Sequence, residues 1–126
     1  MNHWEIAPIL GVSDVAAAVE FFCEKLGFER PERLYGEPGE PPVYTIVKRD
    51  GVSVHLQIRR DGIFAGPRGV HDTDAMFTVD QVDALATQFA GRGVTFLRGV
   101  QNEPYGMRDF TIETPDGHRL LFAQPL

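Results

Sequence analysis

The stretch YGMRDFTIETPDGHRLLF, from Tyr105 to Phe122, predicts one β-hairpin. Its centre, Asp116–Gly117 directly after Pro115, has the residues of a tight turn, because proline presets φ and glycine accepts a positive φ. Residues typical of strands flank this turn on both sides. Such a hairpin either lines a ligand site or only completes a sheet.

An amphipathic helix is predicted much earlier in the chain. Apolar residues recur at spacings of three and four between Val15 and Leu26, which is the period of one helix face. Ser13 or Asp14 can cap the helix at its start, and Gly27 can end it. Cys23 lies on the apolar stripe and is expected to be a buried, small hydrophobic residue.

Strands are predicted around this helix. Tyr35–Pro42 separates them as a loop, because it holds three prolines and two glycines. Asp50–Gly51 repeats the turn chemistry of the C-terminal hairpin. The predicted strands are His3–Gly11, Phe28–Leu34, Val43–Arg49 and Val52–Arg59.

The same order of elements begins again after residue 73. A strand over Ala75–Val79 precedes a helix that Asp80 can cap, and Val94–Arg98 is a strand followed by a loop over Gly99–Pro104. A shift of 66 or 67 positions superposes the two predicted helices and the two Asp-Gly turns. The prediction is an α+β fold of two tandem βαβββ modules, 1–59 and 74–126, with a linker at 60–73. Its eight strands would form a cup-like mixed sheet with the helices outside.

Composition and charge exclude several classes of protein. The net charge is −6 without a basic cluster, which argues against a nucleic-acid-binding surface. No apolar run approaches the roughly 18 residues of a membrane span. A single cysteine allows no intrachain disulfide and no zinc ribbon, and we expect a cytoplasmic protein without a membrane or nucleic-acid partner.

Several segments together resemble a known family. Their order and spacing on the repeated plan are similar to those of the vicinal oxygen chelate superfamily, which groups glyoxalase I, bleomycin resistance proteins, fosfomycin-modifying enzymes and extradiol dioxygenases. The resemblance implies paired modules in a homodimer, with ligand cups at the subunit interface. The matching segments are Val12–Val15, Phe21–Phe22, Leu26–Phe28, Phe77–Asp80, Tyr105–Phe110, Thr114–Gly117 and Leu120–Phe122.

Catalytic members of this superfamily hold a divalent metal with about four His, Glu or Gln side chains. The resemblance places these positions on Ala7, His55, Asp74 and Leu121. Ala7 and Leu121 carry no donor atom, whereas an open catalytic centre generally keeps three protein ligands. We therefore expect the metal-free, bleomycin-resistance-like branch, with no cofactor and no catalytic residue.

The expected function is sequestration of a hydrophobic or cationic, antibiotic-like molecule, which is the role of the antibiotic-resistance members. The alternative is a divalent-metal-dependent lyase, isomerase or dioxygenase that uses His55 and Asp74 with a third ligand not identified. A protein-interaction module with an empty cup is a third interpretation. The expected ligand-binding residues are Tyr105, His55, Asp74, Met107, Ser53, Gln57 and Arg108.

Each of these residues also has a purely structural interpretation. Ser53, His55 and Gln57 share the polar face of their strand, where His55 is either a ligand contact or a hydrogen-bonded sheet histidine.

Tyr105 either stacks on a ligand or packs over a loop, and Met107 is either a pocket wall or a core residue. Arg108 either clamps an anionic group or forms an ion pair, and Asp74 either attracts a cation or is an exposed strand end. The remaining histidines, His3, His71 and His118, are expected to be solvated.

Overall fold

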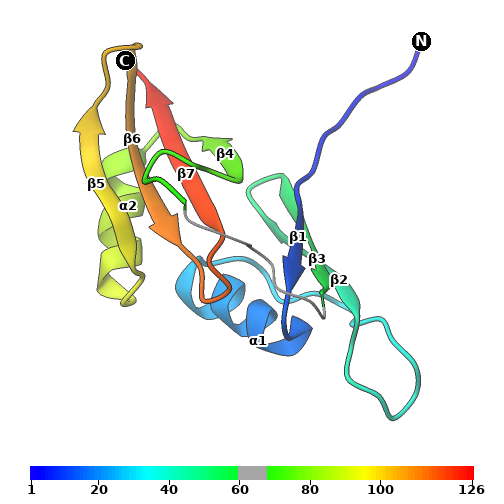
Figure 1. The fold of residues 1–126 in the computed structure, drawn as a ribbon. Helices are drawn as coiled ribbons and strands as arrows, with labels where there is room; N and C mark the ends of the chain where they lie inside the picture. The colour runs from blue at the N-terminus through cyan, green and yellow to red at the C-terminus, as the bar shows by residue number, and fades with distance from the viewer. Residues whose placement is uncertain (60–67) are drawn as a thin grey trace. The chain divides into compact units, whose positions relative to one another are not determined.

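The computed structural model describes residues 1–59 and 68–126 (Figure 1). The chain divides into two compact units, Met1–Ile63 and Phe64–Leu126. Residues 60–67 of the predicted linker lie outside the described residues. No helix in the described ranges is long and apolar enough to cross a membrane.

The first unit is a three-stranded sheet with one helical segment. Its elements in chain order are β1 (Ile9–Val12), α1 (Val15–Glu20), a π-helical turn η1 (Phe21–Lys25), β2 (Tyr44–Arg49) and β3 (Val52–Ile58). The strand order is β1-β3-β2, with β1 parallel and β2 antiparallel to the central β3. We call this the first sheet.

The predicted start and end of the first helix are confirmed. The side chain of Asp14 accepts a hydrogen bond of 2.9 Å from the backbone N–H of Ala17, so Asp14 rather than Ser13 is the cap. Gly27 follows the helix with φ of 73°, a conformation that favours glycine. One face of the helix and one face of the sheet form the core, with Leu10, Val12, Val15, Ala18, Val19, Phe22, Leu26, Val47, Val54 and Leu56 buried.

The second unit is a four-stranded sheet with a longer helix. Its elements are β4 (Ala75–Thr78), α2 (Val82–Gly91), β5 (Phe96–Asn102), β6 (Met107–Glu113) and β7 (Arg119–Pro125). The strand order is β4-β7-β6-β5, with β4 parallel to β7 and the other neighbours antiparallel. This second sheet contains the predicted C-terminal hairpin, which is confirmed.

Four phenylalanine rings form the centre of the second unit. Phe122 of β7 stacks on Phe77 at 5.0 Å and on Phe110 at 5.2 Å between ring centroids. Phe89 of α2 meets the edges of Phe110 at 5.9 Å and Phe122 at 5.3 Å. Since successive side chains of a strand alternate between faces, the even-numbered residues of β6 and β7 face the helix and the odd-numbered residues face away.

The predicted cap of the second helix is wrong. Gln81, not Asp80, is the residue before α2, and its side chain makes no capping hydrogen bond. The backbone N–H of Val82 instead donates to Oε1 of Gln124 at 2.9 Å. Gln124 is an even-numbered residue of β7, so its side chain reaches the helix from the sheet and satisfies an N–H that the helix leaves unpaired.

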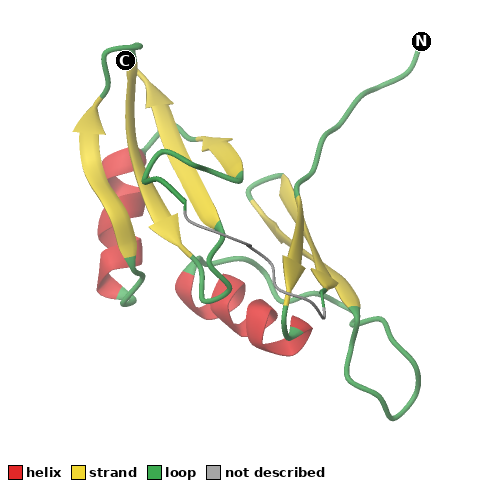
Figure 2. Cartoon of the chain, viewed as in Figure 1, coloured by secondary structure: helices red, strands yellow, loops and turns green. Residues whose placement is uncertain are grey.

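Two of the predicted strands differ from the structure in the first unit. Phe28–Leu34 is not a strand; Glu29 makes only an isolated bridge to Lys48, and Pro31 within the segment has no N–H for a ladder. The first strand begins at Ile9 instead of His3, and the preceding residues are loop (Figure 2). The described residues therefore hold seven strands in two sheets, which confirms the α+β class, and the eight-stranded cup stays a prediction.

β5 extends further than predicted. It runs to Asn102 through most of the predicted loop Gly99–Pro104, and its pairing with β6 changes register twice. Irregular pairing of this kind inserts extra residues into one strand without ending it.

Both hairpin turns have the predicted chemistry. Asp50 and Gly51 take φ of 48° and 83°, and Gly117 takes φ of 89°. His118, expected to be solvated, is only 4% exposed, because its backbone N–H and ring both contact Oγ1 of Thr114 at the base of the turn.

Candidate functional site

The face of the first sheet that points away from α1 carries three of the predicted site residues. Ser53, His55 and Gln57 alternate along β3 with the buried Val54 and Leu56, so the predicted polar face is present. We call this surface the open face of the first sheet. His55 lies beside Ile9 of β1 and Ile46 of β2, and Gln57 beside Tyr44.

Aromatic rings form a row across this open face. The ring of Tyr35 lies 6.1 Å from that of Tyr44, which lies 5.6 Å from the imidazole of His55. The guanidinium of Arg33 lies over Tyr35 at 5.2 Å from the ring centroid. We call Tyr35, Tyr44 and His55 the aromatic row.

A hydrogen bond within the row fixes the histidine. The phenol of Tyr44 bonds Nδ1 of His55, so Nε2 is the ring nitrogen that can meet a ligand. Tyr35 is 45% exposed, whereas Tyr44 and His55 are half-buried. The row therefore offers one accessible ring supported by two ordered rings, an arrangement suited to stacking on a planar or cationic group.

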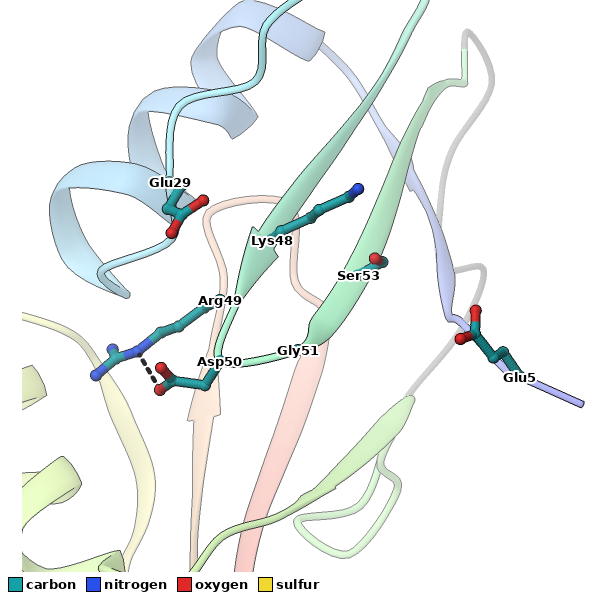
Figure 3. A pocket seen from close by; sticks show the side chains of 7 residues that line it. All are labelled: Glu5, Glu29, Lys48, Arg49, Asp50, Gly51 and Ser53. Carbon is teal, nitrogen blue, oxygen red and sulfur yellow. Dashed lines mark hydrogen bonds and ion pairs between the residues drawn. The ribbon is translucent and has the colours of Figure 1, made fainter.

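A polar hollow of about 370 Å³ lies at the β2–β3 turn (Figure 3). Within it Nε of Arg49 donates to Oδ2 of Asp50 at 3.3 Å, and Nη1 of Arg49 donates to the carbonyl of Leu26 at 2.6 Å. Charged side chains of both signs line the hollow. Ser53, a predicted site residue, also lines it. Its lining residues are Glu5, Glu29, Lys48, Arg49, Asp50, Gly51 and Ser53.

Tyr105 and Met107 lie at the start of β6 in the second unit. Tyr105 is 64% exposed, yet its phenol donates a 2.7 Å hydrogen bond to Oδ2 of Asp109. Donation to this carboxylate, with a smaller contribution from burial, raises the pKa of the Tyr105 phenol to about 12. Met107 is half-buried and shares with Asp109 the face of β6 that points away from α2.

Asp109 belongs to a charged cluster that the sequence interpretation missed. Its side chain is fully buried, and its Oδ1 lies 3.7 Å from Nη1 of Arg98. Arg98 also forms a close ion pair with Glu103, which accepts a 2.7 Å hydrogen bond from Gln101. The bond from Gln101 and the pairing with Arg98 lower the pKa of the Glu103 carboxyl. The alternation of side chains along β6 could have indicated this cluster, since it places Asp109 on the face of the strand opposite to the apolar Phe110.

Asp74 and Arg108 are engaged within the fold. Asp74 accepts bonds from the guanidinium of Arg68 at 2.9 and 3.1 Å and from the N–H of Arg119 at 2.8 Å, and its side chain is 22% exposed. Arg108 is even-numbered and turns to the helix side of β6, where it pairs with Asp83 at 2.8 Å. The ion-pair alternative describes the contacts of Arg108, whereas the exposed strand end given as the structural alternative for Asp74 does not describe its bonds within the fold. The ligand contacts of both residues stay predictions.

The donor atoms at the family's metal-ligand positions do not fit a resident divalent metal. Ala7 and Leu121 carry no donor, and both oxygens of Asp74 are already bonded. In residues 1–59 and 68–126 no three His, Cys, Asp or Glu side chains come together as a metal site. His55 would be the one remaining ligand, fewer than even an open metal site uses.

Solved structures with a similar fold include two proteins described as binding antibiotics. The bleomycin-binding protein of Streptomyces verticillus, solved with copper(II)-bleomycin, is 25% identical with a TM-score of 0.71 over 97% of this chain and 96% of its own. TnmS3, an antibiotic binding protein from Streptomyces sp. CB03234, is 24% identical with a TM-score of 0.71 over 100% and 99% of the two chains. A glyoxalase-related enzyme from Clostridium phytofermentans is 20% identical with a TM-score of 0.79 over 100% and 98%.

No curated protein matches the chain in sequence. A family model does match it, over residues 1–122, and that family is described as the Glyoxalase/Bleomycin resistance protein/Dioxygenase superfamily. The match covers both βαβββ-like halves of the repeat and agrees with the resemblance seen in the sequence. The chain is therefore a member of the glyoxalase/bleomycin resistance protein/dioxygenase superfamily.

Proposed function

We propose that this protein binds a planar or cationic, antibiotic-like small molecule on the open face of the first sheet and holds it without converting it. The aromatic row of Tyr35, Tyr44 and His55 is the observation that carries the proposal. Two observations support the proposal. The chain belongs to the glyoxalase/bleomycin resistance protein/dioxygenase superfamily, and its structural neighbours include the bleomycin-binding protein and TnmS3.

The chemistry of the row suits recognition more than catalysis. One stacked or cation–π contact, here with the accessible ring of Tyr35, contributes about 0.5–2 kcal/mol. The net charge of −6 also attracts a cationic ligand over distances of about a Debye length. Together these effects favour an aromatic cation over an anion of the same size.

Binding without a metal is part of the proposal. It is supported by the donor-free side chains of Ala7 and Leu121 and by the bonds that already saturate Asp74. Ligand affinity should therefore be the same after dialysis against EDTA. Loss of affinity on chelation, restored by one divalent ion per chain, would contradict this part of the proposal.

We also propose that the functional form is a homodimer with its ligand cups at the subunit interface, as the family resemblance implies. Ile9 of β1, which is 64% exposed beside the aromatic row, is an apolar side chain that a second copy could cover. Light scattering coupled to size-exclusion chromatography tests this, and a monomer at micromolar concentration would contradict it.

The decisive experiment is calorimetric titration with metal-free bleomycin and with copper(II)-bleomycin. Tyr35→Leu removes the accessible ring of the row and should weaken binding about tenfold, the equivalent of about 1.4 kcal/mol. Tyr35→Phe keeps the ring and should bind like the wild type. Leu34→Ala, an equally exposed neighbour outside the row, is the control for nonspecific loss of apolar area.

Two results would overturn the proposal. The first is absence of binding to every bleomycin form and to a panel of aromatic cations. The second is binding that Tyr35→Leu leaves unchanged, because the ligand would then lie away from the row.

A further inference from the structure

Two neighbouring side chains of β6 present buried oxygen atoms that lack a hydrogen-bond partner in the described residues. They are Oδ1 of Asp109 and Oγ1 of Thr111, and both side chains are fully buried. Residues two apart in a strand lie on the same face, so these oxygens share the face that points away from α2. Buried polar groups are nearly always hydrogen-bonded in native proteins, so two adjacent exceptions indicate a binding site for a hydrogen-bond donor.

The surrounding charges favour a positively charged donor. Asp109 and Glu103 are two carboxylates, and Arg98 is the guanidinium that contacts both. Two carboxyl groups therefore share one guanidinium. Glu103 is the better satisfied carboxylate, because it accepts from both Arg98 and Gln101, whereas Oδ1 of Asp109 has only the longer 3.7 Å contact.

Tyr105 is the exposed side chain that is hydrogen-bonded to Asp109. Its phenol bonds the other oxygen of Asp109, but most of its ring is exposed. It belongs to a tight turn in which the N–H of Gly106 donates to the carbonyl of Glu103, and Gly106 takes φ of 86°. A change of the Tyr105 rotamer would open Asp109 without altering the strand.

A small and an apolar side chain of the neighbouring strand flank Asp109 and Thr111. Asp109 pairs with Ala123 of β7, and Thr111 pairs with Leu121. Ala123 is the smallest side chain beside the cluster, and Leu121 adds an apolar wall. A small organic ammonium group, with its apolar body against Leu121, matches this combination.

We propose that Asp109 and Thr111 form a cation-recognition subsite of the second unit that takes a primary ammonium group of a small molecule once Tyr105 turns aside. The ammonium donates to Oδ1 of Asp109 and to Oγ1 of Thr111, and the displaced Tyr105 ring packs against the ligand body. This inference goes beyond the proposed function, because it concerns a group of residues in the second unit and does not depend on binding at the open face of the first sheet.

The test is an NMR titration of the ¹⁵N-labelled full chain with benzylammonium, and with benzyl alcohol as the uncharged analogue. Benzylammonium should shift the amide signals of Asp109, Thr111 and Tyr105 in a saturable way, and benzyl alcohol should bind at least tenfold more weakly. Asp109→Asn should weaken benzylammonium binding at least tenfold. Asp83→Asn, which removes the same charge on the helix side of the sheet, should leave it unchanged.

Thr111→Val is the second variant, since Asp109→Asn alters a buried charge and can unfold the unit. It keeps the shape of the side chain and should weaken benzylammonium binding about threefold to tenfold.

Three results would overturn the inference: equal binding of the alcohol and the ammonium, a wild-type affinity in both variants, or shifts confined to other residues. Binding of benzylammonium that depends on Asp109, together with no binding of bleomycin, would keep the subsite and refute the proposed function. Binding of bleomycin, together with no binding of benzylammonium that depends on Asp109, would refute the subsite alone.

Discussion

Replacing Tyr105 by phenylalanine isolates the hydrogen bond between its phenol and Asp109. The bond is 2.7 Å long and its acceptor is a buried carboxylate, a type that contributes about 1.5–3 kcal/mol when fully buried. The rise of the Tyr105 pKa from 10.0 to about 12 corresponds to about 2.7 kcal/mol before solvent screening. Because the ring is 64% exposed, we discount this value and expect Tyr105→Phe to lower the free energy of unfolding by about 1 kcal/mol.

The dependence of this effect on pH follows from the direction of the shift. The folded protein holds the phenolic proton more tightly than the unfolded chain, so the bond stabilises the fold fully below pH 10. This stabilisation is lost as the pH rises from about 10 to about 12. The difference between wild type and Tyr105→Phe should therefore be constant from pH 7 to pH 9 and shrink above pH 10.

Urea denaturation followed by circular dichroism measures the difference. Tyr35→Phe is the matched control, because Tyr35 is also a half-exposed tyrosine but the structure records no hydrogen bond of its phenol within the described residues. Absorbance titration of the three tyrosines should show one that ionises near pH 12 and that Tyr105→Phe removes. Equal stability of Tyr105→Phe and wild type at pH 7 would refute the reasoning, as would a Tyr35→Phe variant that loses just as much.

Three further predictions concern the fold. Gln124→Ala should lower the free energy of unfolding by about 1 kcal/mol, because the N–H of Val82 loses its hydrogen-bond acceptor. Asp80→Ala should change the free energy of unfolding by less than about 0.5 kcal/mol. Thermal unfolding compares the two variants, and a larger loss in Asp80→Ala would mean that Asp80 is the cap after all. Phe89→Ala should lower the free energy of unfolding, measured by urea denaturation, by about 3–5 kcal/mol, because the ring is buried against Phe110 and Phe122. A loss under about 1 kcal/mol would mean that α2 is loosely packed on its sheet. Gly51→Ala should lower the free energy of unfolding by about 1 kcal/mol through backbone strain alone, since an added Cβ meets no atom within 4 Å. An unchanged midpoint of urea denaturation would contradict the left-handed conformation of this turn.

Local sequence signals predicted the elements whose causes are themselves local. Asp14 caps the helix that begins at the next residue, Gly27 ends that helical segment, and Asp50–Gly51 turns a hairpin between adjacent strands. Each of these contacts spans only a few residues, so the chemistry is legible without knowledge of the fold. The strand at Phe28–Leu34 was wrongly predicted because apolar composition alone does not show whether a partner strand is in register.

Contacts between distant residues account for what the sequence did not show. Gln124 caps a helix that begins 42 residues before it, and nothing near Asp80 or Gln81 indicates this. The pairing of Asp74 with Arg68 was hidden because Arg68 lies in the predicted linker, a segment without period. The aromatic row was missed for a similar reason, since Tyr35 lies in the predicted loop and meets Tyr44 only through an isolated bridge.

The repeat explains why the two open faces differ in chemistry while the two cores agree. Leu56 and Phe122 occupy corresponding positions 66 residues apart, and both are buried against their own unit's core. His55 and Leu121 also correspond, but they point away from the helices. Truncation on the helix side costs several kcal/mol, whereas the outward positions do not belong to the two helix-side cores. The outward faces could therefore become an aromatic row in one unit and a charged cluster in the other without loss of the fold, and it is at these positions that specificity for a ligand has to be sought.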